Sequence, residues 1–294
     1  MVTQQKQRKK DKVRKPCLFY YTGGRGRTGT SLRTLDFEFV SVPLTIQVGD
    51  TIYTDDAQLN IDQMMEEMYA TTTASKSACP SPDDYMKSFE GADNIFVVTI
   101  TGTLSGSYNS AEVAKKIYLE EHPNTNIHVI NSLSAGGEVD LIVRKLNQLV
   151  AEGLDFDQVV DVITTYQSKT KLLFVLAKVD NLVKNGRLSK LLGTVVGLLN
   201  IRMVGEASKT GTLELLQKAR GQKKAIKAAF DELIKAGYNG GHITIAHRNN
   251  EKFIEQFSEL VREKFARAMI EVLPTSGLCS FYAEEGGLLM GYEI

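Results

Sequence analysis

The stretch NIFVVTITGTLSGSYNSAEVAKKIYLEE, residues 94–121, decides the fold class. It starts with an apolar run rich in β-branched side chains, which predicts a buried strand over 94–100. It ends with the apolar spacing of an amphipathic helix over 109–121. Small and hydroxyl residues without a charge lie between the two. A strand, a short loop and a helix in this order form half of a parallel βαβ unit.

The same order of elements recurs in the first half of the chain. A second β-branched run at 126–131 precedes another small-residue loop and a helical pattern over 136–153. Repeated strand, loop and helix units predict a mainly parallel sheet with crossover helices. Upstream, the sequence predicts a buried strand at 17–22, a strand pair within 37–56 joined by a Gly-Asp turn, and helices at 61–72 and 81–91.

The second half predicts a mixed sheet with helices. After a helix at 155–170, an apolar run at 171–178 begins a new alternation, with helices within 185–199, 223–237 and 251–266 and strands at 201–207, 212–220, 242–247, 269–275 and 288–294. A chain of 294 residues, 43% of them hydrophobic, is long enough for two cores. We therefore predict a protein of two α/β domains, residues 17–167 and 168–294, preceded by a flexible basic tail over residues 1–16.

The balanced total charge hides an uneven distribution. The chain has 35 basic and 35 acidic residues, and residues 1–16 hold seven of the former and one of the latter. The remainder therefore carries 28 basic and 34 acidic side chains, a net charge of −6. A basic tail can contact nucleic acid or anionic lipid, but a polar terminal segment without aromatic residues is more often a solvated extension. We assign the tail no function and expect no nucleic-acid partner.

The sequence has neither a membrane segment nor a cysteine framework. No apolar run is long enough to cross a membrane, and no apolar signal region stands at the N-terminus. Cys17, Cys79 and Cys279 are too few and too widely spaced for a disulfide framework or a zinc site. We expect a cytoplasmic protein with reduced thiols and no bound metal.

The loop after the strand at 94–100 has the composition of an anion-binding site. In open α/β sheets, ligands collect at the carboxyl ends of strands, where helix N-termini direct N–H groups outward. Glycines let a ligand approach the backbone, and hydroxyls donate hydrogen bonds without adding negative charge. The residues concerned are Thr101, Gly102, Thr103, Ser105, Gly106 and Ser107. A capped helix start with a tight turn explains them equally well.

A second hydroxyl-rich segment, residues 74–84, precedes another expected helix. Ser77 in this segment can reach the same anion as Ser105 if both loops open on one edge of a parallel sheet. Otherwise Ser77 is an ordinary turn residue. The loop at 131–138 has a similar composition, and we interpret it as structural.

Recognisable catalytic patterns are missing from the sequence. His122, His128, His242 and His247 do not stand in a Ser-His-Asp, Cys-His or H-E-x-x-H context. The chain has no P-loop, dinucleotide fingerprint or G-x-S-x-G elbow, and no pair of carboxylates stands out for acid–base work. Hydroxyls, glycines and apolar strands favour binding, so we predict no catalytic residue.

Four longer segments together resemble the DegV family of fatty-acid-binding proteins. They are FVVTITGTLSGSYNSA (96–111), ACPSPDDY (78–85), the block from NGRLSK to GQKKA (185–225) and GLCSFYAEEGGLLMGYEI (277–294). The similarity runs in the right order from about residue 17 to the C-terminus. It implies two α/β domains with one fatty acid buried between them, its carboxylate held by hydroxyls and its chain in an apolar tunnel.

The resemblance also implies particular ligand-binding residues. The first hydroxyl of the family's T-S-x-P-S motif corresponds to Ser77, and the serine of its L-S-G-[ST]-Y motif is Ser105. Both are implied to bind the carboxylate, with Thr101 and Gly106 beside the second serine. Cys279 falls where many members have a histidine near the carboxylate.

Two arginines match motifs that, in the family, present the carboxylate or contact a separate fatty-acid kinase. They are Arg187 in NGRLS and Arg220 in KARGQKKA. Guanidinium groups suit a phosphate made at this position, because their planar forks pair two oxygens at once. Without the resemblance, both would be read as solvated surface arginines.

The chain also departs from the family pattern. Many members place an Asp-Ser pair after the first strand, where this chain has TGGRGRTGTS with Thr22 and Arg25. Ala78 stands where a second hydroxyl is common, and Cys279 supplies only a weak donor. These departures bear on competence with a kinase and on the identity of the ligand.

Taken together, the residues and the resemblance predict a carrier without catalytic activity of its own. It binds a long-chain fatty acid such as palmitate, stearate or oleate, needs no cofactor, and can present the acid to a partner kinase that makes an acyl phosphate. The alternative is an enzyme on a small anionic metabolite, with Ser105 as nucleophile; it needs a base beside Ser105. Candidates for the tunnel wall, or for ordinary core, are Phe281, Tyr282, Leu288 and Met290.

Overall fold

The computed structural model describes residues 17–20, 38–188 and 200–294, and its first sheet is parallel throughout. The strands follow the order β2-β1-β6-β7 and are β1 (Cys17–Tyr20), β2 (Glu38–Ser41), β6 (Asn94–Thr99) and β7 (Asn126–Asn131). Residues 95–99 of β6 are all buried, as expected for a strand with both faces covered. The predicted parallel sheet is confirmed.

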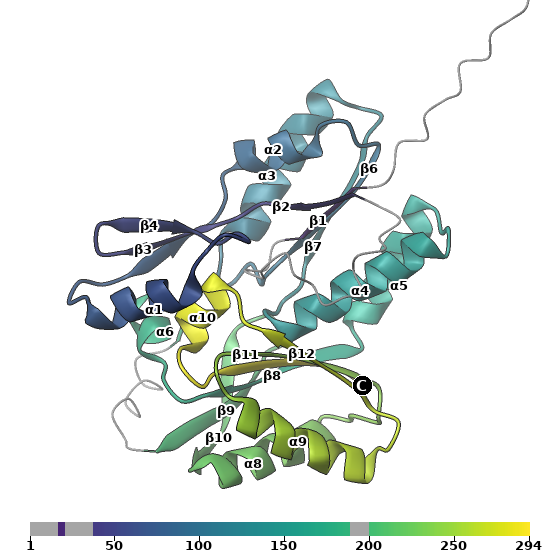
Figure 1. Ribbon diagram of the computed structural model, residues 1–294. Helices are drawn as coiled ribbons and strands as arrows, with labels where there is room; N and C mark the ends of the chain where they lie inside the picture. The colour runs from purple at the N-terminus through teal and green to yellow at the C-terminus, as the bar shows by residue number, and fades with distance from the viewer. Residues whose placement is uncertain (1–16, 21–37, 189–199) are drawn as a thin grey trace, which may run out of the picture.

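Helices cover both faces of the parallel sheet, as crossover connections require. On one face lie α2 (Pro82–Phe89) and α3 (Ser107–Glu121), and on the other α4 (Gly137–Ala151) and α5 (Phe156–Gln167) (Figure 1). α2 starts where the sequence predicts a helix: Ser81 caps it, Pro82 occupies its first turn, and Asp84 completes a capping box. The helix predicted over 155–170 ends at Gln167.

A separate three-stranded antiparallel sheet carries one of the candidate site segments. It consists of β3 (Thr45–Val48), β4 (Thr51–Thr54) and β5 (Lys76–Ala78), with α1 (Ile61–Ala70) between β4 and β5. The predicted hairpin at Gly49-Asp50 is confirmed. The expectation of a loop around residue 77 is wrong, because β5 pairs with β3; a polar strand of three residues has no periodic pattern to reveal it.

The second sheet is mixed, which confirms the prediction for this half. Its order is β10-β9-β8-β13-β11-β12, with only β11 and β12 parallel. The strands are β8 (Thr170–Leu176), β9 (Ile201–Ala207), β10 (Leu213–Arg220), β11 (His242–His247), β12 (Met269–Pro274) and β13 (Leu288–Glu293). α8 (Gln222–Lys235) and α9 (Glu251–Lys264) cover its outer face, while α4 lies against the inner face (Figure 1).

Two short helices also lie in the described part of this half. α6 (Asp180–Lys184) precedes the block predicted as helical over 185–199, most of which lies outside the described residues. α10 (Gly277–Ala283) was not predicted, because seven residues are too short for a clear helical period. α10 packs against both α1 and α6.

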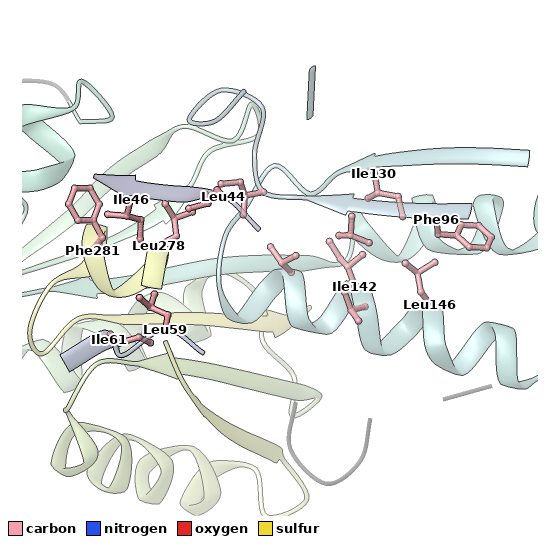
Figure 2. Close-up of a cluster of buried hydrophobic side chains, with 14 of the residues drawn as sticks. Leu44, Ile46, Leu59, Ile61, Phe96, Ile130, Ile142, Leu146, Leu278 and Phe281 are labelled. Atoms are coloured by element: carbon pink, nitrogen blue, oxygen red, sulfur yellow. The ribbon is translucent and has the colours of Figure 1, made fainter. Parts of the chain in front are cut away.

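One buried apolar cluster joins the two halves of the chain (Figure 2). It combines Phe96 and Ile130 of the parallel sheet with Leu146 of α4 and with Leu278 and Phe281 of α10. The two large sheets come from opposite sides of residue 168, yet this single core contains residues from both sides of that position. The domain boundaries therefore stay a prediction.

The helix α4 lies directly on the backbone of the second sheet. A Cβ on Gly137 would be 2.1 Å from the carbonyl oxygen of Thr244, and one on Gly291 would be 2.2 Å from the backbone nitrogen of Glu138. Only glycine fits at both positions, so the two halves are joined by backbone contact as well as by side chains.

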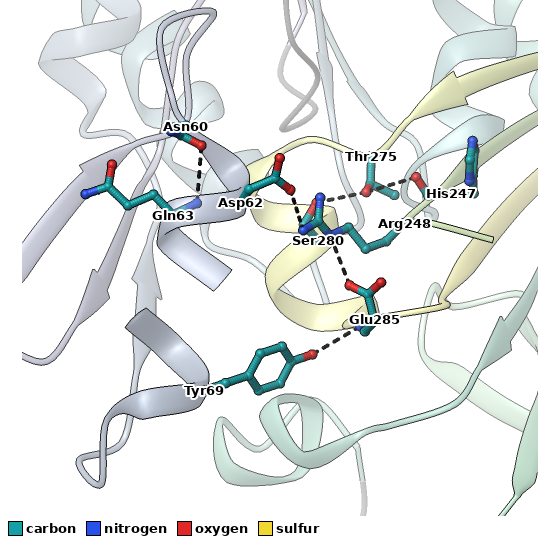
Figure 3. A network of polar contacts seen from close by, with 9 residues as sticks. All are labelled: Asn60, Asp62, Gln63, Tyr69, His247, Arg248, Thr275, Ser280 and Glu285. Atoms are coloured by element: carbon teal, nitrogen blue, oxygen red, sulfur yellow. Dashed lines mark hydrogen bonds and ion pairs between the residues drawn. The ribbon is translucent and has the colours of Figure 1, made fainter. Parts of the chain in front are cut away.

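Polar contacts fasten α1 to the far end of the chain (Figure 3). Arg248, after β11, pairs with Asp62 of α1 at 2.7 Å and with Glu285 at 3.4 Å. The Tyr69 hydroxyl accepts a hydrogen bond from the Glu285 backbone N–H. These contacts hold α1 close to α10, which helps to form the site described below.

Other sequence expectations have simple outcomes. The basic tail and the positions Thr22 and Arg25 lie outside the described residues. None of the helices in the described ranges combines the length and the apolar composition needed to cross a membrane. Within those ranges Cys79 is an exposed free thiol and Cys279 a buried one, and no group of three potential ligands is placed to hold a metal.

Candidate ligand-binding site

A cavity of about 320 Å³ lies where the loops of the parallel sheet meet the three-stranded sheet and the second sheet. Its size is at the lower end of the range for small-molecule sites. Most of its wall is apolar: Leu44, Ala78, Ile100, Leu104, Ala135, Leu172, Phe174, Leu176, Leu182, Leu213, Leu278, Ala283 and Leu289. The polar lining residues are Ser77, Cys79, Thr101, Ser105, Arg187, Cys279 and Tyr282.

The structure brings together six of the seven residues that the family resemblance proposes for contact with the ligand or a kinase. The cavity is lined by Ser77, Thr101, Ser105, Gly106, Arg187 and Cys279. Arg220 is exposed at the end of β10 and is not among the described residues that line the cavity. Its proposed role therefore concerns the surface outside the cavity.

Ser77 reaches the cavity from β5, where it stands opposite Ile46 of β3. Its Oγ lies 2.8 Å from the Tyr282 hydroxyl of α10, a hydrogen bond across 205 positions of sequence. Burial raises the pKa of Tyr282, although the Ser77 hydroxyl and the Arg187 charge act in the opposite direction. The expectation that Ser77 and Ser105 lie on neighbouring loops of one parallel sheet is wrong, since Ser77 belongs to the antiparallel sheet.

Ser105 stands just before α3. Its Oγ lies 2.9 Å from the Ser107 Oγ and accepts a hydrogen bond from the Ser107 N–H at 3.2 Å. The N-cap of α3 is Gly106, which has no side chain to cap the helix, and the first turn of α3 has no acidic residue. A 15-residue helix with this N-terminus at a cavity wall favours a negatively charged group there.

The loop at 131–138 supports the loop at 101–107, here called the hydroxyl loop. This agrees with the structural role expected for residues 131–138. The Thr101 N–H donates to the Ser134 carbonyl at 2.8 Å. The Asn131 Oδ1 accepts from the N–H of Gly102 at 3.0 Å and from that of Leu133 at 3.2 Å. Neighbouring βα loops thereby fix one another's backbone.

Arg187 holds its guanidinium at the hydroxyl end of the cavity. Its Nε donates to the Leu104 carbonyl at 3.2 Å and its Nη1 to the Asn185 carbonyl at 2.7 Å. The guanidinium carbon lies 5.5 Å from the centre of the Tyr282 ring. A cation is therefore placed beside the ring of Tyr282, whose hydroxyl is hydrogen-bonded to Ser77.

α10 is held by an aspartate that sequence reasoning missed. The two carboxylate oxygens of buried Asp55 accept hydrogen bonds from the N–H groups of Gly277 and Leu278, each at 2.8 Å. Burial raises the pKa of Asp55 to about 6, although these two hydrogen bonds act to lower it. No local pattern distinguishes Asp55, because its partners lie more than 220 positions further along the chain.

Cys279, in the same helix, is a fully protonated thiol. Its side chain is buried, and burial raises its pKa to about 12, so it presents S–H rather than a thiolate to the cavity. A weak donor of this kind contributes little to holding an anion.

The apolar wall comes largely from residues that the sequence did not single out. Leu172, Phe174 and Leu176, at alternate positions of β8, line the cavity, while Leu173 and Val175 face the opposite core. Period-two alternation is the signal that identifies such a face, but it does not say what the face encloses. Of the four tunnel candidates, Tyr282 lines the cavity, and Phe281, Leu288 and Met290 are core residues.

Two α/β halves that enclose an apolar cavity with hydroxyls and an arginine at one end define a small-molecule-binding protein. Residues 32–292 match the family described as uncharacterised protein, DegV family, and the chain belongs to the DegV family. A DegV domain-containing protein from Streptococcus gordonii is 77% identical over 260 residues, which cover 88% of this chain and 92% of the relative.

Solved structures share the whole fold. The fatty acid kinase (Fak) B3 protein of Streptococcus pneumoniae, loaded with linoleic acid, is 70% identical, with a TM-score of 0.91 over 95% of this chain and 99% of that one. A DegV family protein from Eubacterium eligens, loaded with heptadecanoic acid, is 36% identical, with a TM-score of 0.88 over 95% and 99% of the two chains.

Proposed function

We propose that this protein binds one long-chain fatty acid, such as palmitate, stearate or oleate, in the cavity described above. The observation that carries the proposal is the composition of the cavity: apolar walls lead to one polar end, where hydroxyls, a helix N-terminus and an arginine meet. The fatty acids bound in two family members, at 70% and 36% identity, support the same assignment.

The carboxylate is held, in this proposal, at the polar end. Ser77 and Ser105 donate to it, and Thr101 and Gly106, the N-cap of α3, line the same space. Cys279 lies beside them as a neutral thiol. These donors replace water around the carboxylate, whose desolvation otherwise costs several kcal/mol.

Affinity comes from the acyl chain. Burying a chain of ~16 carbons at about 0.8 kcal/mol per CH₂ contributes on the order of 12 kcal/mol as an upper bound, before the costs of association. Leucines and Phe174 of the wall supply the apolar surroundings. The hydroxyl end then selects an acid over other lipids of equal length.

We further propose that the protein is a carrier that presents the carboxylate to a separate fatty-acid kinase in the cytoplasm. The similarity to a protein named as part of fatty acid kinase supports this role, as does the position of Arg187. Arg220 is exposed, which suits contact with a partner. The carrier itself needs neither a cofactor nor a catalytic residue.

The alternative is an enzyme that acts on a small anionic metabolite at the same loops. Such an enzyme needs a base beside Ser105. The described residues that line the cavity include no histidine, aspartate or glutamate, and Ser105 is hydrogen-bonded to Ser107. The wall of the cavity is also mostly apolar, which does not suit a small anionic metabolite.

Native mass spectrometry of freshly purified protein tests the proposal. We expect a mass increase of one C14–C18 acid that departs on denaturation and is identified after solvent extraction. Protein stripped of lipid should take up added oleate or palmitate at one equivalent. Protein that is purified empty and does not bind either acid would reject the carrier function and favour the small metabolite.

A further inference from the structure

The turn between β9 and β10 reaches from the second sheet to the hydroxyl loop. The Thr103 hydroxyl donates to the Gly211 carbonyl of this turn at 2.7 Å. The Thr103 Oγ1 also lies 2.9 Å from the Thr101 Oγ1. Thr101 is buried and lines the cavity, whereas Thr103 is exposed. Two hydroxyls therefore connect the cavity wall to a segment 108 positions away.

The direction of these hydrogen bonds follows from counting protons. A hydroxyl has one hydrogen to donate, and Thr103 gives its hydrogen to Gly211. Thr101 must then be the donor to Thr103. While the turn is in place, the Thr101 hydrogen points away from a ligand, which leaves Ser77 and Ser105 as the hydroxyl donors for the carboxylate.

Gly211 fits against Thr101 without spare room. It is buried with a φ of +80°, and a Cβ on it would be 2.1 Å from the Thr101 Oγ1. Both the backbone angle and the contact require glycine. The close approach allows the short hydrogen bond from Thr103.

Hydrogen bonds within the turn hold its own conformation, whereas its other side borders a cleft and not a packed core. The Ser208 hydroxyl bonds Thr210 and Thr212, and the Ser208 N–H donates to the Thr212 carbonyl. The turn also borders a polar cleft of about 750 Å³, which Ser208, Lys209 and Thr210 help to line. Leu213, directly after the turn, lines the apolar cavity. Displacement of the turn into the cleft would open the cavity wall at Leu213.

We propose that Thr103 is a positioning residue whose hydrogen bond to Gly211 latches the β9–β10 turn over the cavity and sets the rate at which the fatty acid enters and leaves. The inference rests on the proposed function. It concerns exchange kinetics rather than recognition of the carboxylate.

Stopped-flow exchange of a naturally fluorescent polyene fatty acid tests the latch. Thr103→Val keeps the shape and removes the hydroxyl, Thr103→Ser keeps the hydroxyl, and Gly211→Ala inserts the clashing Cβ. Gly237→Ala is the matched control, because Gly237 has a φ of +102° but nothing within 4 Å of its Cβ position.

We expect Thr103→Val to raise both association and dissociation rates about tenfold, the factor that corresponds to loss of one hydrogen bond. Kd should change less than either rate. Gly211→Ala should act in the same direction, and Thr103→Ser and Gly237→Ala should behave as wild type.

Rates unchanged in Thr103→Val, even with a lower melting temperature, would assign a purely structural role and overturn the latch. Thr103 is exposed, so this variant keeps the test valid if Gly211→Ala does not fold. The wild-type protein separates the two proposals, since failure of wild type to bind the probe rejects the carrier function and says nothing against the turn contact.

Discussion

Ser77 and Ser105 approach the cavity from different sheets, and each is fixed by its own partner. We predict that Ser77→Ala combined with Ser105→Ala weakens fatty-acid binding about 100-fold, because hydrogen bonds to charged groups contribute at least ~1.5 kcal/mol each. Affinity for a fatty alcohol of the same length should change little. Isothermal titration with both lipids measures the difference.

Ser168→Ala is a suitable control for that titration. Ser168 donates to the Thr165 carbonyl at the end of α5 and does not line the apolar cavity. Equal affinity of the double variant and this control for the acid would show that the head group binds elsewhere.

Cys79 and Cys279 provide an internal comparison at the same cavity. In a Cys17→Ser background, iodoacetamide should alkylate exposed Cys79 and spare Cys279, whose burial raises its pKa to about 12. Added fatty acid should slow alkylation of Cys79, since that residue lines the cavity. Peptide mass mapping over time follows both sites. Equal labelling of the two thiols in the folded protein would contradict the burial of α10.

At the scale of an element, the Asp55 carboxylate holds the N-terminus of α10. Ionisation of this buried group lowers the free energy of unfolding, so the stability depends on pH. Burial raises its pKa from 3.8 to about 6. A raised pKa means that its contribution to stability is fully present below about pH 4 and is lost as the pH rises through 6. The shift corresponds to ~3 kcal/mol in the free energy of unfolding.

We predict that Asp55→Asn removes this fall in stability between pH 4 and 6. Urea unfolding at half-unit steps of pH measures it. Asp50→Asn, at an exposed turn between β3 and β4, should retain the wild-type curve. A slope that persists in Asp55→Asn would show that other groups produce it.

Elements with a clear period were predictable from the sequence, and elements fixed by distant partners were not. β6, β7, α3 and α4 were predicted because their apolar residues recur at regular spacing. β5 and α10 are short, and their partners lie on other elements: β3 for β5, and Asp55 for α10. Ser105 stands in a recognisable loop, whereas nothing near Ser77 indicates Tyr282.

At the scale of the whole molecule, the halves depend on contact between α4 and β13. We predict that Gly291→Ala lowers the free energy of unfolding by about 3 kcal/mol, because the new Cβ meets backbone that cannot rotate away. Gly91→Ala should cost only about 1 kcal/mol, since Gly91 has a φ of +83° but open space around it. Urea denaturation compares the two. Equal losses would mean that α4 shifts freely on the sheet.

The position of β13 also affects the order in which this protein can fold during synthesis. β13 is made after β8 and β11 but lies between them in the sheet. Until the ribosome has released residues 288–293, β8 and β11 have no shared neighbour, and each exposes an unpaired apolar edge. Folding of the second half must therefore wait until residues 288–293 have left the ribosome, and nascent chains before this point are natural clients for a chaperone that shields strand edges.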